Sequence, residues 1–223
     1  MSVSGCFLIL FLLFHMSMNI VAIFSGEAYD AICGFLGANW YALAGTLVLA
    51  AGVLVHILYA IWLTLQNRKA RGNVRYAVTA REEGVSWASK NMLVLGFVVL
   101  GGLLLHLWNF WAKMQLVEIM GGHEVVLCNG DVVSPTDGSA LIQYTFGQWY
   151  FVALYIIWLA ALWFHLTHGV WSMFQSTGWA NAIWYPRLKC IANIVATIIF
   201  LCFAAVVVVF FVRSLGCASG VCI

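Results

Sequence analysis

Five long apolar runs constrain the fold of this chain more than any other feature of its sequence. They cover about residues 3–24, 40–65, 92–111, 149–174 and 191–212. About 20 apolar residues suffice for a helix to cross a bilayer, and the backbone inside a bilayer must satisfy its own hydrogen bonds. Only 8% of the residues are charged, against about 25% in soluble domains. We therefore expect an all-α integral membrane protein, with residues 1–223 forming one domain of five transmembrane helices.

The distribution of basic residues predicts the orientation of these helices. Six of the ten Lys and Arg residues lie between residues 66 and 91, and Arg187 and Lys189 lie between the fourth and fifth runs. By the positive-inside rule both loops face the cytoplasm, which places the N-terminus inside and the C-terminus outside. The 66–91 loop is longer than a helix connection needs. It could dock a soluble partner, but insertion alone also requires a basic inner loop.

Four histidines lie inside four of the apolar runs: His15, His56, His106 and His165. An ionisable side chain at membrane depth is costly, so it indicates a functional site by default. One histidine in each of four helices suggests two bis-imidazole sites, as a bundle holding two b-type haems needs. A proton relay, a metal transporter and structural histidines are the alternatives that the residues leave open. His15 also argues against a signal peptide, as does the lack of a charged segment before the first run.

The depth of the histidines predicts how they pair. His56 and His165 each lie about ten residues before the cytoplasmic end of a run, which places both in the inner half of the membrane. His15 and His106 lie closer to the outer ends of their runs. We expect His56 with His165 at an inner haem and His15 with His106 at an outer haem, as axial ligands of the iron. With both axial positions filled, such haems transfer electrons and do not bind gases.

Two further histidines need an interpretation. His168 follows His165 by three residues on the same helix face, so either could be the ligand. Depth favours His165, because it matches His56. His168 lies about one turn nearer the cytoplasm, where it could contact a haem propionate or extend to the interface. His123 lies in a polar outer segment and is interpreted as a solvated loop residue.

Several short motifs occur in order along the chain. They are Ser4-Gly5-Cys6-Phe7-Leu8 and Phe14-His15-Met16 in the first run, Val55-His56 in the second, Leu105-His106-Leu107 in the third, and the sequence FHLTHGVWS of residues 164–172 in the fourth. With these motifs the chain resembles, over essentially its whole length, the single-subunit di-haem cytochrome b anchor of succinate:quinone oxidoreductases and quinol:fumarate reductases. The likeness is greatest to anchors from anaerobic Bacteroidetes-type bacteria.

This resemblance implies a fold, cofactors and partners. The first four helices would surround two b haems, and the fifth would pack outside them. In the family the fourth ligand lies four residues before a glycine that opens a Gly-x-aromatic stretch, which His165 satisfies with Gly169 and Trp171. The implied partners are a flavoprotein with covalently bound FAD and an iron–sulfur protein on the cytoplasmic face, in a complex that can dimerise. The implied location is the bacterial inner membrane.

The resemblance also implies an electron-transfer function with menaquinone, or another quinone, as substrate. Quinol would release its protons near the outer haem, where Glu27 and Asp30 are candidate proton acceptors, although both could be ordinary solvated acids. Some menaquinol-oxidising members carry a glutamate where this chain has Trp163, so no proton route is expected through that helix. The direction, fumarate reduction or succinate oxidation, stays open. The alternatives are a cytochrome b subunit of a formate dehydrogenase or hydrogenase, and a haem-free transporter.

Overall fold

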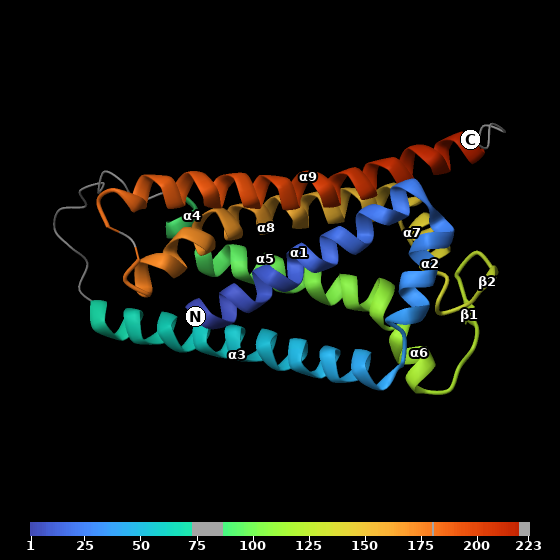
Figure 1. Ribbon diagram of the computed structural model, residues 1–223, viewed down its shortest axis with the longest axis horizontal. Coiled ribbons are helices and arrows are strands. Elements are labelled where there is room, and N and C mark those ends of the chain that lie inside the picture. The colour runs from blue at the N-terminus through green and yellow to red at the C-terminus, as the bar shows by residue number, and fades with distance from the viewer. Residues whose placement is uncertain (73–86, 180, 219–223) are drawn as a thin grey trace.

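The computed structural model describes residues 1–72, 87–179 and 181–218 (Figure 1). Five of its helices are long and apolar enough to cross a membrane, which confirms the five predicted spans. They are α1 (Ser2–Phe24), α3 (Trp40–Arg71), α5 (Met92–His106) with its continuation η1 (Leu107–Trp111), α8 (Trp149–Ser176) and α9 (Trp184–Ala218).

Two of these helices extend beyond the apolar runs that predict them. Helix α3 continues to Arg71 and carries three basic residues in its last turn, where cations interact favourably with the helix dipole. Helix α9 begins at Trp184, and Pro186 lies in its first turn, where proline removes no helical hydrogen bond. Hydropathy therefore predicts the apolar part of each helix and not its full length. Most of the basic 66–91 loop lies outside the described residues.

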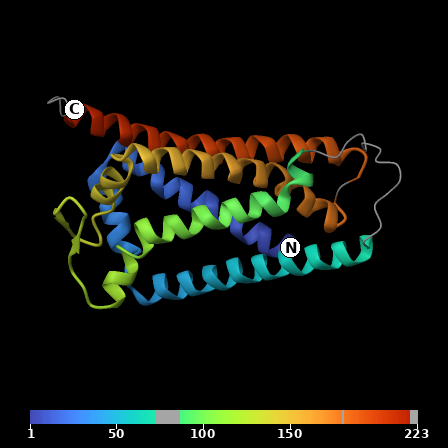
Figure 2. The same cartoon turned by 180° about the vertical axis from the view of Figure 1, so that it is seen from behind.

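Helices α8 and α9 run side by side along the molecule (Figures 1 and 2). The buried face of α8 includes Tyr155, Leu159, Leu162 and Leu166, spaced three or four residues apart as one face of a helix requires. Small and branched residues of α9 complete this core: Ala192, Ala196, Ile199, Val206 and Val207. Helix α9 also packs on α1. Helix α3 lies on the opposite side of the molecule from α9 and buries none of its residues in the protein.

The segments expected as outer loops contain short elements of their own. They are α2 (Gly26–Phe35), α6 (Gln115–Ile119), the antiparallel pair β1 (Val125–Val126) and β2 (Val132–Val133), and α7 (Gly138–Phe146). All of them gather at the end of the molecule opposite the start of α1, whereas α4 (Trp87–Lys90) lies at the other end (Figure 1). The side chains of Ser25 and Asp137 accept hydrogen bonds from Ala28 N and Ala140 N. These N-caps begin α2 and α7.

Candidate functional site

The structure brings the four predicted histidines together in two pairs. The ring centroids of His15 on α1 and His106 on α5 are 5.8 Å apart, with the ring planes at 84°. Those of His56 on α3 and His165 on α8 are 6.3 Å apart, with the planes at 63°. These are the two pairs that the depth of the histidines predicts. After that prediction we call His15 with His106 the outer pair and His56 with His165 the inner pair. That each pair binds a haem stays a prediction.

The separation within each pair fits two imidazoles that bind one metal ion from opposite sides. A metal ion lies about 2 Å from the imidazole nitrogen that binds it, so the two ring centroids are then about 6 Å apart. In the described part of the chain, no three His, Cys, Asp or Glu side chains come together as a metal site. The histidines therefore occur as pairs, and each pair can fill two opposite positions of a metal whose other ligands come from elsewhere.

Glycines of two neighbouring helices lie beside the inner pair. A Cβ atom placed on Gly5 of α1 would lie 3.9 Å from His56 Cε1, and one on Gly96 of α5 would lie 4.0 Å from His165 Cε1. Four helices, α1, α3, α5 and α8, therefore meet around these two rings. The Nδ1 atom of His165 is buried and has no hydrogen-bond partner in the described part of the chain. A buried, neutral imidazole of this kind can serve as a ligand for haem iron.

Aromatic rings surround the outer pair. Phe11 stacks on His15 with centroids 5.4 Å apart, and Phe203 of α9 lies 5.8 Å from the same ring. The fifth long helix therefore reaches the outer pair from the side of α1. The Trp158 ring lies 5.7 Å from that of His106, and its indole rests on Gly102, where a Cβ would come within 1.9 Å of Trp158 Cδ1. Only glycine admits the indole at this position.

A chain of hydrogen bonds leads from His15 to α2. Asn19 Nδ2 donates to the carbonyl oxygen of His15 at 2.8 Å, and the Tyr29 hydroxyl donates to Asn19 Oδ1 at 3.1 Å. Burial raises the pKa of the Tyr29 phenol well above its usual value, so this hydroxyl remains a hydrogen-bond donor. Our sequence reasoning missed both residues. The signal for Asn19 was an amide one helical turn after His15 in an apolar run.

Another polar residue that the sequence does not predict as functional lies after His106. The helix changes there to π geometry over Leu107–Trp111, a rare distortion that often accompanies functional sites. Within it Asn109 is only 1% exposed, and its Nδ2 lies 3.4 Å from the Tyr155 hydroxyl oxygen. The Tyr155 ring in turn lies 6.4 Å from that of His106. This pair adds polar groups to the apolar surroundings of the outer site.

His168 lies in a separate group of residues near the C-terminal end of α8. Its ring contacts Trp171 with centroids 5.1 Å apart. The Lys189 ammonium lies 4.9 Å from the Trp171 ring centroid and 4.4 Å from that of Tyr185. The ring that contacts His56 is that of His165, so the structure separates the two neighbouring histidines as depth predicts. The Nδ1 atom of His168 is buried without a partner among the described residues.

The two candidate proton acceptors differ in their surroundings. Asp30 accepts hydrogen bonds from Ser139 N and Ser139 Oγ, both at 2.8 Å, and so ties α2 to the start of α7. Glu27 is exposed in the first turn of α2. Asp30 therefore has a structural role, whereas Glu27 is open to solvent or to a ligand. His123 is exposed, as expected for a loop residue.

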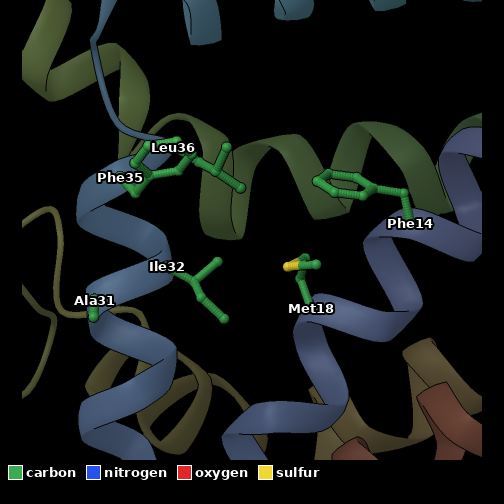
Figure 3. Close-up of a pocket in the computed structure, with 6 residues that line it drawn as sticks. All are labelled: Phe14, Met18, Ala31, Ile32, Phe35 and Leu36. Carbon is green, nitrogen blue, oxygen red and sulfur yellow. The ribbon is translucent and has the colours of Figure 1, made fainter.

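A cavity of about 330 Å³ opens between α1 and α2, on the same part of α1 as His15. Its lining is apolar and consists of Phe14, Met18, Ala31, Ile32, Phe35 and Leu36. Figure 3 shows Phe14 and Met18 of α1 reaching toward the same space as Ile32 of α2. The volume lies at the lower end of the range of ligand pockets, and the lining offers apolar contacts alone.

No protein-family model, curated protein or solved structure matches this chain. The likeness to the cytochrome b anchors therefore rests on the order of short motifs across the spans. The two histidine pairs add a geometric observation that is independent of that likeness.

Proposed function

We propose that this chain is the di-haem cytochrome b subunit of a fumarate reductase or succinate dehydrogenase complex. The observation that carries the proposal is the arrangement of four intramembrane histidines in two facing pairs. Two protein ligands per site are too few for a metal held by side chains alone, which usually has three or four. They suffice for haem, because the macrocycle supplies the other four nitrogens.

The chain's own residues would hold two b haems, His15 with His106 on the outer side and His56 with His165 on the inner side. The haems would supply one-electron transfer across the membrane. Two imidazoles bound to each haem iron would leave no position open for oxygen. The rings of Phe11 and Trp158 pack against the outer pair, and His168 would contact a propionate on the cytoplasmic side.

Quinone chemistry belongs at the outer end. The apolar cavity beside α1 suits the hydrophobic part of menaquinone or another quinone, and Glu27 is the carboxylate open to accept a proton from the quinol. Both oxygens of Asp30 are occupied by Ser139, so we assign proton transfer to Glu27 in preference to Asp30. No reaction of succinate or fumarate is assigned to this chain, because dicarboxylate chemistry would take place on the flavoprotein subunit.

The basic end of the molecule is the proposed docking face for the flavoprotein and iron–sulfur subunits. Helix α3 ends there in Arg68, Lys69 and Arg71, and Figure 1 shows that this end of α3 extends past the start of α1. Following the positive-inside rule, this end faces the cytoplasm of a bacterial inner membrane. Electrons would pass between the inner haem and the iron–sulfur subunit docked on this face.

Purification of the chain from its native membrane tests the proposal. We expect about two low-spin haems per chain and co-purification of a flavoprotein and an iron–sulfur protein that interconvert succinate and fumarate. Co-purification of a partner that oxidises formate or hydrogen would instead assign the chain to the cytochrome b subunits of formate dehydrogenases or hydrogenases. A stable but colourless preparation would exclude the haem sites and favour a transporter.

A further inference from the structure

The first turn of α1 contacts one histidine of the inner pair. Ser4 Oγ lies 3.2 Å from His56 Nδ1, although the two residues are far apart in sequence. The adjacent Gly5 lets α1 approach the ring, since a Cβ there would lie 3.9 Å from His56 Cε1. A hydroxyl group therefore lies against one ring nitrogen of His56, and the His165 ring lies 6.3 Å away, centroid to centroid.

The other hydrogen bond of Ser4 indicates which of the two groups, the Ser4 hydroxyl or the His56 imidazole, donates the hydrogen in this contact. The Ser4 hydroxyl donates its one hydrogen to the Met1 carbonyl oxygen at 3.0 Å. Its lone pairs remain free to accept a hydrogen bond, so the hydrogen between Ser4 and His56 belongs to the imidazole. With the hydrogen on Nδ1, the Nε2 atom of neutral His56 is bare and able to bind a metal ion.

We propose that Ser4 is a positioning residue for the inner site: it fixes the Nδ1–H tautomer of His56 and keeps Nε2 available as the axial ligand. This inference rests on the proposed haem function. A hydrogen bond accepted from the distal N–H of a ligating histidine raises the basicity of the ligand. Ser4 therefore stabilises the oxidised form of the inner haem and lowers its reduction potential.

The two rings of the inner pair differ in this respect. The Nδ1 atom of His165 is buried and has no partner in the part of the chain that the structure describes. Of these two imidazoles, only His56 thus has a hydrogen-bond partner there on Nδ1. A change at Ser4 should consequently alter the inner haem through one ligand and leave the outer pair, held by α1 and α5 farther along the bundle, unaffected.

The test uses Ser4→Ala in the purified complex, with Ser4→Thr as the conservative variant and Ser17→Ala as the matched control. Ser17 is on the same helix, is exposed and donates only to the Phe14 carbonyl in its own helix. Redox titration and electron paramagnetic resonance give the potential and g values of each haem. In Ser4→Ala we expect a positive shift in the potential of the inner haem and altered g values. Ser4→Thr and Ser17→Ala should resemble the wild type.

Unchanged potentials and g values in Ser4→Ala, with both haems present in the wild type, would overturn this inference alone. An equal shift in Ser17→Ala would also overturn it, because the effect would then come from the helix and not from the contact with His56. Wild-type protein without haem would overturn the proposed function, and the assignment of Ser4 with it.

Discussion

At the scale of single residues, the assignment of the inner ligand depends on two histidines three positions apart. Spacing alone places His165 and His168 on one helix face and cannot separate them. Their contacts do separate them, because the His165 ring faces His56 and the His168 ring faces Trp171 near Lys189. The choice of ligand thus follows from a difference of about one helical turn in depth.

Replacing each histidine by leucine tests this assignment. We expect His165→Leu to lose the inner haem, so that the haem content falls from about two to about one per chain, because His56 alone cannot supply both axial ligands. His168→Leu should retain both haems and change at most the potential of the inner one. The pyridine haemochrome assay, normalised to protein, measures the content. Loss of a haem in His168→Leu with retention in His165→Leu would reverse the assignment.

At the scale of elements, hydrogen bonds hold the short helices α2, α6 and α7 to one another and to the long helices. Asp30 on α2 binds the backbone and the hydroxyl group of Ser139 in α7. Gln115 on α6 accepts from Thr46 on α3 at 2.8 Å and from Trp111 at 2.9 Å. These contacts tie α2 to α7 and α6 to α3, so the helix that carries Glu27 and lines the cavity is held in place.

The two acids of α2 should therefore respond differently to substitution. Asp30→Ala removes two hydrogen bonds to the start of α7, and we expect the free energy of unfolding to fall by about 2 kcal/mol. Glu27→Gln should leave stability unchanged and slow quinol oxidation about 100-fold or more, because a general base contributes about 10²–10⁴-fold. Thermal unfolding in detergent and quinol-dependent reduction of the haems measure the two effects. Normal quinol turnover in Glu27→Gln would show that Glu27 is not the proton acceptor.

At the scale of the whole molecule, the sequence predicts the spans and the histidine pairs for simple physical reasons. A bilayer imposes length and hydropathy on each helix, and equal depth brings His56 to His165. The contacts of Asn109 with Tyr155 and of Ser4 with His56 were not predictable. The Asn109–Tyr155 contact depends on a π segment whose position is set by packing. The Ser4–His56 contact depends on how α1 packs against α3. The helices of the outer end were missed although Ser25 and Asp137 are ordinary N-cap residues.

The orientation of the molecule in the membrane is the remaining large-scale prediction. The basic end of α3 and the start of α1 lie at one end of the molecule, and the C-terminal end of α9 lies at the other (Figure 1). Because positive residues are retained on the cytoplasmic side, the exposed Cys128 between β1 and β2 should face outward. Asn67, exposed near the end of α3, should face the cytoplasm.

Cysteine labelling distinguishes the two faces. In the first variant, six of the seven cysteines are replaced by serine and Cys128 is retained. In a second, Asn67→Cys is introduced after Cys128 is also replaced by serine. A membrane-impermeant maleimide should label Cys128 in intact spheroplasts, and the cysteine of Asn67→Cys only after the membrane is permeabilised. The reverse pattern would place the basic end outside, and the flavoprotein and iron–sulfur subunits could not then dock there from the cytoplasm.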